Sequence, residues 1–214
     1  MSLHKNIEHI NIDLGVLPLM YAPGENPFIS HEEIYFLLKL AYKKKGNMLE
    51  IGVNRGKTTS NLARIAKYEN LKFIGVDVTE VPSTICDAQG PGECLSANLV
   101  GCDISEENKN HVDIHLINPN NPKSLSELLQ NLNLKYDFVF IDGDHSYAGV
   151  KRDYESILPF LSENGVMVFH DVWWDVEPPP VKGPLKLLSE TEGYIVNKTH
   201  LGILRSQMKR FSNV

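Results

Sequence analysis

Short runs of apolar residues recur along the chain and alternate with segments in which apolar residues follow a helical spacing. Two of the helical segments, SLSELLQNL and YAGVKRDYESILPFL, lie between the later apolar runs. Such an alternation of strands and helices is typical of a doubly wound, mostly parallel sheet. The apolar runs predict strands at residues 47–53, 72–78, 111–117, 136–142 and 165–171.

The two ends of this pattern differ from its centre. Residues 30–46, SHEEIYFLLKLAYKKKG, begin with a capping serine and acidic residues and end with a lysine cluster before a glycine, which predicts a helix. Near the other end, YIVNKTH and LGILRS lie close enough along the chain to form a hairpin. We therefore expect an α/β, Rossmann-like sheet of seven strands, mostly parallel, with an antiparallel C-terminal hairpin.

Length and composition predict a single domain over residues 1–214. A chain of 214 residues with 42% hydrophobic residues is large enough for one extensive core. Residues 1–45 are expected to form an N-terminal helical cap segment. Residues 79–104 have weak periodicity and are long for a plain connection, so they predict an insertion or lid over a ligand, with disorder as the alternative.

Charge and apolar patterning argue against two classes of partner. The chain has 21 basic and 27 acidic residues, a net charge of -6, and no dense stripe of lysine and arginine. We therefore expect no nucleic-acid partner and no membrane partner. The sequence shows no apolar leader after a basic start and no run of about eighteen apolar residues, so it predicts a cytoplasmic protein. A homo-oligomer is compatible with this composition.

A glycine-containing turn follows the first predicted strand and reads Glu-Ile-Gly-Val-Asn-Arg-Gly-Lys-Thr from Glu50. A phosphate-binding loop needs four residues between its first glycine and Gly-Lys-Thr, whereas Gly52 and Gly56 enclose three. A dinucleotide-binding loop needs glycine where this chain has Asn54. The pattern that remains is E-x-G-x-x-x-G.

This pattern resembles the glycine loop of class I S-adenosylmethionine-dependent methyltransferases. The resemblance implies that the glycines let the backbone pass close to the methionine part of the cofactor, and that the leading carboxylate orders the loop and meets the ammonium group. An acidic residue at the end of the second strand, here Asp77, would then accept hydrogen bonds from the ribose hydroxyls. The implied cofactor-binding residues are Glu50, Gly52, Val53, Asn54, Gly56, Thr58, Asp77 and Asp142.

Titratable side chains end the fourth and fifth predicted strands. Asp142 closes YDFVFID, and His170 and Asp171 close GVMVFHD. If these strands are neighbours, about 4.8 Å apart, the side chains converge at the edge where open α/β sheets bind ligands. Two carboxylates suit Mg²⁺ or another divalent cation, and His170 as a third ligand would favour a transition metal.

The tract DGDHSYAGVKRDYESILPFLSENGVMVFHDV resembles a subgroup of these methyltransferases that includes small-molecule and sugar O-methyltransferases and cephalosporin-hydroxylase-like proteins. The resemblance implies that Asp142 and Asp171 hold a metal and that Asp144 is the catalytic base. Where the subgroup has Asp-Asp, this chain has His170 followed by Asp171. His145 is the competing base, because its ordinary pKa of about 6.5 suits proton uptake near neutral pH. We expect Asp144 to be the base if a metal is bound, and His145 if none is.

The leading hypothesis is an enzyme that transfers a methyl group from S-adenosyl-L-methionine to a hydroxyl of a small metabolite or sugar, assisted by Mg²⁺ or another divalent cation. An enzyme that uses NAD or a nucleotide sugar on a similar sheet is one alternative. A non-catalytic relative that keeps the fold and binds the cofactor is another.

Overall fold

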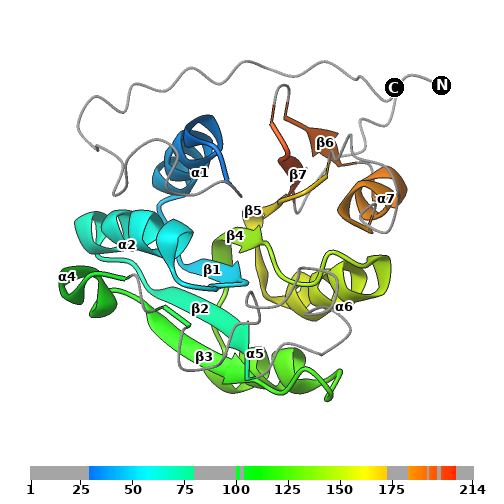
Figure 1. Cartoon of the computed structure of the whole chain (residues 1–214), viewed down its shortest axis with the longest axis horizontal. Helices are drawn as coiled ribbons and strands as arrows, with labels where there is room; N and C mark the ends of the chain where they lie inside the picture. The colour runs from blue at the N-terminus through cyan, green and yellow to red at the C-terminus, as the bar shows by residue number, and fades with distance from the viewer. Residues whose placement is uncertain are drawn as a thin grey trace, which may run out of the picture.

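A computed structural model describes residues 29–79, 100–101, 104–172, 183–191, 193–196 and 199–205. These residues form a seven-stranded sheet in the order β3-β2-β1-β4-β5-β7-β6 (Figure 1). The strands are β1 (Met48–Ile51), β2 (Phe73–Val78), β3 (Asp113–Ile117), β4 (Tyr136–Ile141), β5 (Leu161–Phe169), β6 (Tyr194–Ile195) and β7 (Gly202–Arg205).

Strand directions follow the predicted plan. Strands β1 to β5 pair in parallel, and β7 is antiparallel both to β5 and to β6. The second strand of the C-terminal hairpin therefore inserts between β5 and the short edge strand β6. The prediction of a Rossmann-like, mostly parallel sheet of seven strands with an antiparallel C-terminal hairpin is confirmed.

Strand β5 begins earlier than the sequence predicted. Its partner Tyr136 is in register with Leu161, whereas Phe138 is in register with Val166, so the pairing shifts between these positions. The residues between Leu161 and Gly165 are Ser, Glu and Asn, and they are half-buried or exposed. The predicted start at residue 165 was wrong because this polar stretch of an irregular strand carries no apolar alternation.

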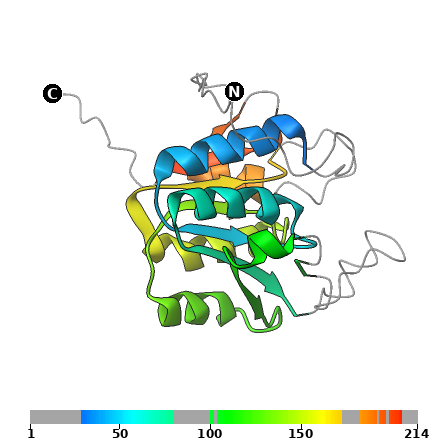
Figure 2. The same ribbon diagram turned by 90° about the vertical axis from the view of Figure 1, so that its left-hand side faces the viewer.

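Helices cover both faces of the sheet. Figure 1 shows α1 and α2 on one side of the strands and α6 and α7 on the other, and Figure 2 shows α1 and α2 side by side in front of the sheet. None of the helices in the described ranges has the length and apolar character that crossing a membrane requires. The α-helices are α1 (His31–Lys44), α2 (Lys57–Glu69), α4 (Glu106–Lys109), α5 (Ser124–Leu132), α6 (Tyr147–Ile157) and α7 (Gly183–Glu190), with a 3₁₀ turn η2 (Leu158–Phe160) after α6.

The alternation of side chains along the central strand β4 divides the interior into two cores. Phe138 and Phe140 enter the core that contains apolar residues of α1 and α2. Val139 and Ile141 enter the opposite core, which contains apolar residues of α5, α6 and α7. Because successive side chains of a strand point to opposite faces, one continuous apolar run fills both layers.

Helix α1 has the sequence-predicted boundaries at both ends. Ser30 is the N-cap and forms a capping box with Glu33: the Glu33 N–H donates to Ser30 Oγ (3.2 Å), and the Ser30 N–H donates to Glu33 Oε2 (2.7 Å). At the other end, Lys45 has a left-handed backbone (φ 51°). Residues 1–28 of the predicted cap segment, and residues 80–99 and 102–103 of the predicted lid, lie outside the described residues.

The end of β1 approaches the end of β4 too closely for a side chain between them. Gly52 has φ 91°, and a Cβ atom there would lie 2.1 Å from the carbonyl oxygen of Asp142. Backbone bonds hold this approach, since the Asp142 N–H donates to Ile51 O (2.8 Å) and the Gly52 N–H to Val76 O (2.9 Å). The glycine therefore lets β1 and β4 end side by side.

We predict that Gly52→Ala lowers the free energy of unfolding by at least about 2 kcal/mol, because alanine adds backbone strain and a steric overlap that no side-chain rotation relieves. Chemical denaturation of both proteins measures the difference. Gly143→Ala is the matched control at the same edge, since its Cβ would come no nearer than 3.3 Å to Ile51 Cγ2. The control should stay within about 1 kcal/mol of the unsubstituted protein; equal losses in the two variants would contradict the interpretation.

Candidate active site

The parallel pairing of β4 and β5 brings the three predicted metal ligands together. Asp142 follows β4, His170 and Asp171 follow β5, and the His170 N–H donates to Ile141 O (3.0 Å). His170 Nδ1 lies 3.2 Å from Asp142 Oδ1 and 3.3 Å from Asp171 Oδ1. Potential ligand atoms of the three side chains lie within 4.8 Å of one another. Their role as metal ligands stays a prediction.

Asp171 reaches this position through an uncommon backbone conformation. Its φ is 53°, in the left-handed region, and its side chain is buried. Aspartate is one of the few residues other than glycine that adopt this region readily. The conformation ends β5 and turns the carboxylate back towards the end of β4, where it meets His145 and His170.

His145 bridges the carboxylates that follow the two strands. Its Nε2 lies 3.2 Å from Asp142 Oδ1, and its Nδ1 lies 3.3 Å from Asp171 Oδ2. Burial lowers the pKa of His145, but its hydrogen bond to Asp142 and the charges of Asp142 and Asp171 together raise the pKa above the ordinary value. The structure thus places this candidate base at the predicted metal ligands.

The charges of this cluster hold its members in unlike protonation states. Burial would raise the pKa of Asp142, but His170 and His145 lower it to about 2. Burial would lower the pKa of His170, but Asp142, Asp171 and Glu33 raise it to about 12. These opposite pKa shifts favour a carboxylate at Asp142 beside a protonated ring at His170. A metal ion at this position would have to replace that proton.

Asp144, the other candidate base, faces a different element. Its Oδ1 accepts a hydrogen bond from the Ser146 N–H (2.9 Å), and its Oδ2 lies 3.9 Å from Arg152 Nη2. A Cβ atom on Gly149 would lie 2.1 Å from Asp144 Oδ2, so the carboxylate rests on the first turn of α6. The structure thus places His145 within 3.3 Å of Asp142 and Asp171, while the contacts of Asp144 are with Ser146 and Arg152.

The glycine loop connects β1 to α2 through three left-handed residues. Gly52, Asn54 and Gly56 have φ values of 91°, 49° and 92°. A Cβ atom on Gly56 would lie 2.4 Å from Ile104 Cγ1, so this glycine, like Gly52, meets a packing requirement of the protein itself. Val53 is buried, and Thr58 is half-buried in the first turn of α2.

Glu50 is the least expected feature of this loop, because its carboxylate is fully buried. Its exposure is 0%, and neither carboxylate oxygen has a hydrogen-bond partner among the described residues. Burial raises the pKa of Glu50 well above its ordinary value; the neighbouring Thr59 opposes this rise, and the charges of Asp142 and Asp77 add to it. Unpartnered buried acceptors are costly, and a bound cation or hydrogen-bond donor would relieve this cost.

Asp77 fastens the glycine loop to the end of β2. Its Oδ2 accepts a hydrogen bond from the Asn54 N–H (2.6 Å), and its Oδ1 accepts one from the Val78 N–H (2.7 Å). Burial raises the pKa of Asp77, and these backbone donors lower it in part. The sequence placed Asp77 correctly at the strand end, but its contact with Asn54 depends on the tertiary structure.

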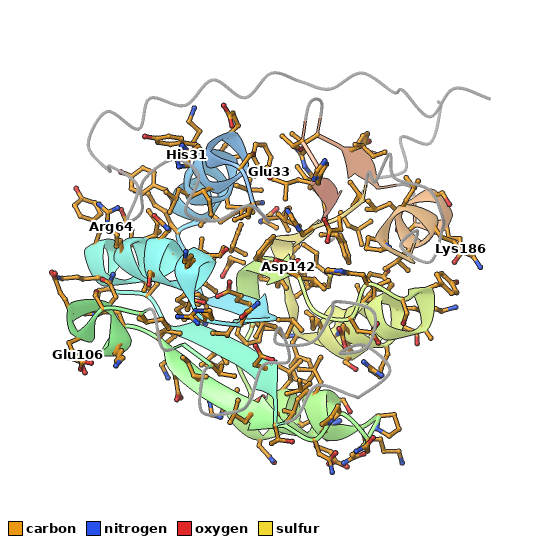
Figure 3. The ribbon with its side chains drawn as sticks, viewed as in Figure 1. His31, Glu33, Arg64, Glu106, Asp142 and Lys186 are labelled. Carbon is orange, nitrogen blue, oxygen red and sulfur yellow. The ribbon has the colours of Figure 1, made fainter. Side chains whose placement is uncertain are left out.

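Glu33 belongs to the same edge of the sheet and was missed by sequence reasoning. It lies on α1, and Figure 3 shows that α1 faces the end of β4, where Asp142 lies. Its Oε1 accepts a hydrogen bond from the His200 N–H (2.6 Å), and its Oε2 lies 3.8 Å from His170 Nε2. Burial would raise the pKa of Glu33, but His170 and the backbone donors of Ser30 and His200 lower it to about 2. The capping pattern S-x-x-E was its only signal in the sequence.

Residues 49–172 match a family model described as a methyltransferase domain. The chain belongs to this methyltransferase family. This confirms the sequence-based assignment. An uncharacterized protein, R132, of Acanthamoeba polyphaga mimivirus is 30% identical over 123 residues, which are 58% of this chain and 50% of that protein. The methyltransferase chain thus spans about half the length of this curated relative.

Solved structures of O-methyltransferases share the fold. CalS11, a calicheamicin methyltransferase also named a TDP-rhamnose 3'-O-methyltransferase, has a TM-score of 0.57 at 16% identity, covering 83% of this chain and 80% of that one. An O-methyltransferase from Bacillus cereus, solved with S-adenosylhomocysteine, has a TM-score of 0.54 at 17% identity, covering 86% and 82%. MycE of mycinamycin biosynthesis, solved with Mg and S-adenosylhomocysteine, has a TM-score of 0.56 at 14% identity, covering 86% and 52%.

We predict that Asp153, buried on α6 beside Arg152, makes this methyltransferase domain less stable as pH rises. Burial raises the pKa of Asp153 from 3.8 to about 6, although Arg152 partly opposes the rise. Between these two values the folded protein holds more protons than the unfolded chain, so the free energy of unfolding falls as pH increases from about 4 to about 6. The difference corresponds to about 3 kcal/mol at roughly 1.4 kcal/mol per pH unit.

Asp153→Asn should therefore flatten this part of the stability profile and stabilise the protein at pH 7 by up to about 3 kcal/mol. Denaturant titrations between pH 4 and pH 8 measure the effect. The control is Glu155→Gln, which removes an exposed carboxylate of the same helix and should leave the slope unchanged. An unchanged slope in Asp153→Asn would refute the assignment.

Proposed function

We propose that this protein transfers a methyl group from S-adenosyl-L-methionine to a hydroxyl of a small metabolite or sugar, assisted by a divalent cation. Membership of the methyltransferase family supports the reaction class. The observation that carries the proposal is Glu50, whose buried carboxylate has no hydrogen-bond partner among the described residues and lies at the start of the glycine loop.

The residues around the loop fit the cofactor. Glu50 would accept hydrogen bonds from the ammonium group and ionise as that charge arrives, because a cation beside a carboxyl lowers its pKa. Asp77 keeps acceptor capacity beyond its two backbone bonds, which suits ribose hydroxyls. The bound cofactor would supply an electrophilic methyl group on sulfur. The loop residues Gly52, Val53, Asn54, Gly56 and Thr58 are the proposed lining.

A donor set of two carboxylates and one imidazole fits a divalent cation beside the acceptor. Asp142, His170 and Asp171 would hold the ion. The chemistry that such an ion supplies is a lower pKa for the acceptor hydroxyl and a fixed direction for its oxygen. Asp142 would contribute to the binding of both the cation and the cofactor. It is a proposed ligand of the cation, and its charge also raises the pKa of Glu50, the proposed partner of the cofactor's ammonium group.

His145 is the proposed base even with a cation bound, although the sequence alone favoured Asp144 in that case, because His145 contacts Asp142 and Asp171 while Asp144 pairs with Arg152. One ring nitrogen of His145 can donate its N–H to a carboxylate at a strand end, while the other ring nitrogen takes the proton of the acceptor hydroxyl. Asp144 accepts from the Ser146 N–H and pairs with Arg152 instead, which supports a role in holding the turn before α6. The alternative of an NAD or nucleotide-sugar enzyme gains no support, because the family that matches is a methyltransferase family.

We expect calorimetry with S-adenosylhomocysteine to show binding, and Glu50→Gln to weaken it by roughly 10- to 100-fold, as the loss of a hydrogen bond to a charged group implies. Titrations with Mg²⁺ and with EDTA separate the cation's contribution. Glu69→Gln, on α2 beside Lys45, is the control that should bind normally. Absence of binding in every condition would rule out the proposed cofactor.

We also expect His145→Gln to reduce methyl transfer by about 10²- to 10⁴-fold, which is the contribution of a general base to catalysis. Asp144→Asn should change methyl transfer by less than about threefold, because Asp144 is not the proposed base. Radiolabelled S-adenosylmethionine and a panel of catechols, free sugars and TDP-linked sugars provide the assay. S-adenosylhomocysteine binding should survive in both variants. The reverse ranking of the two variants would make Asp144 the base.

A further inference from the structure

His170 has one ring nitrogen that the proposed methyl-transfer site does not use. The ring is only 3% exposed, and Nδ1 lies between Asp142 and Asp171. Nε2 is buried and has no hydrogen-bond partner among the described residues, because its neighbour Glu33 Oε2 is 3.8 Å away, beyond hydrogen-bond distance. A buried polar atom left unsatisfied destabilises the folded protein. A further ligand at Nε2 would remove this cost.

Two other potential metal ligands lie beside the His170 ring. Glu33 comes from α1, and His200 comes from the turn between β6 and β7. The Glu33 carboxylate accepts from the backbone N–H of His200, which brings this turn against α1. The imidazole rings of His170 and His200 have centroids 6.3 Å apart. One ligand atom from each of Glu33, His170 and His200 lies within 4.8 Å of the others.

These distances are close to those of a first-row metal site. Metal bonds to histidine nitrogen and carboxylate oxygen are about 2.0–2.2 Å long, so ligand atoms at tetrahedral angles lie roughly 3.4 Å apart. The 3.8 Å between Glu33 Oε2 and His170 Nε2 is near that value. His200 is exposed, which gives an ion a route from solvent, while Glu33 and His170 are buried.

The donor atoms also select the type of ion. Two imidazole nitrogens and one carboxylate oxygen suit zinc, cobalt, nickel or iron in the divalent state, whereas Mg²⁺ prefers oxygen ligands and keeps several of its waters. We propose that Glu33, His170 and His200 form a second divalent-metal site, selective for transition-metal ions, on the Nε2 side of the His170 ring. This second site goes beyond the proposed function, because no step of methyl transfer uses it.

A bound ion would join three segments that are distant in sequence. It would tie the first turn of α1 to the end of β5 and to the turn before β7, at the edge where Asp142 and Asp171 lie. The competing explanation is that Glu33 and His170 form only an ion pair, with His170 protonated between carboxylates. An ion pair of that kind would show no preference for transition metals and no dependence on the His200 side chain.

The test is Co²⁺ binding to the full chain, freed of metal with a chelator, in excess Mg²⁺. Because the first proposed site, of Asp142, His170 and Asp171, also contains an imidazole, Asp171→Asn is used to weaken that site. Equilibrium dialysis gives the amount bound, and the visible absorption of Co²⁺ reports nitrogen ligation. We expect binding to persist in Asp171→Asn and to weaken in Glu33→Gln and His200→Gln. The loss should exceed the roughly 10- to 100-fold typical of residues that only support a metal ligand.

His115→Gln is the matched control, since this histidine of β3 pairs with Asp113 at the far edge of the sheet and should not affect binding. Thermal unfolding checks each variant. Glu33→Gln removes a charge that caps α1 and could unfold the protein. In that case His200→Gln is the deciding variant, because it keeps the backbone hydrogen bond from residue 200 to Glu33. Unchanged Co²⁺ binding in His200→Gln, or no Co²⁺ bound in the presence of Mg²⁺, would overturn the second site. Normal S-adenosylhomocysteine binding in the same preparation would leave the proposed function standing.

Discussion

The placement of negative charge around His170 is the constraint on which this edge of the structure depends. Three carboxylates, from Glu33, Asp142 and Asp171, surround an imidazole that is almost completely buried. Each carboxylate would be unfavourable there alone, because burial penalises the charged form. With the ring protonated, or with a cation in its place, the charges compensate one another. The same contacts join α1, β4, β5 and the turn before β7.

Glu50, on β1 beside β4, shows the opposite situation. Its carboxyl is buried as completely, yet it has no compensating cation among the described residues, and the charges of Asp142 and Asp77 make ionisation still harder. Such a group does not stabilise the fold, because replacing it with an apolar residue of similar volume would remove the cost. Its position beside the glycine loop gives it a use in binding a cationic group. The carboxylates at the ends of β4 and β5 are thus suited to a metal cation, whereas Glu50 on the neighbouring strand β1 is suited to the cationic group of a bound molecule.

Much of the fold could be predicted because apolar alternation and turn residues are local signals. The strands, the helix from Ser30 and the C-terminal hairpin all follow from patterns within about fifteen residues. The start of β5 could not, since Ser162 to Asn164 are polar and lie in the register shift between the Leu161–Tyr136 and Val166–Phe138 pairs. Glu33 could be recognised as a capping residue, but nothing local indicated that its carboxylate also contacts the segments at His170 and His200.

The candidate site, like the fold, could be predicted from the sequence only in part. By itself the sequence determined which chemistry is available, because Glu50, Asp77, Asp142, His145, His170 and Asp171 fall at strand ends whose order implies a shared edge. Only the tertiary structure decided which of these groups touch. Asp144 and His145 are adjacent in the chain, yet one carboxylate turns to Arg152 of α6 and the other side chain bridges Asp142 and Asp171. That choice depends on side-chain direction and on charges brought in by other strands, which no local pattern of residues encodes.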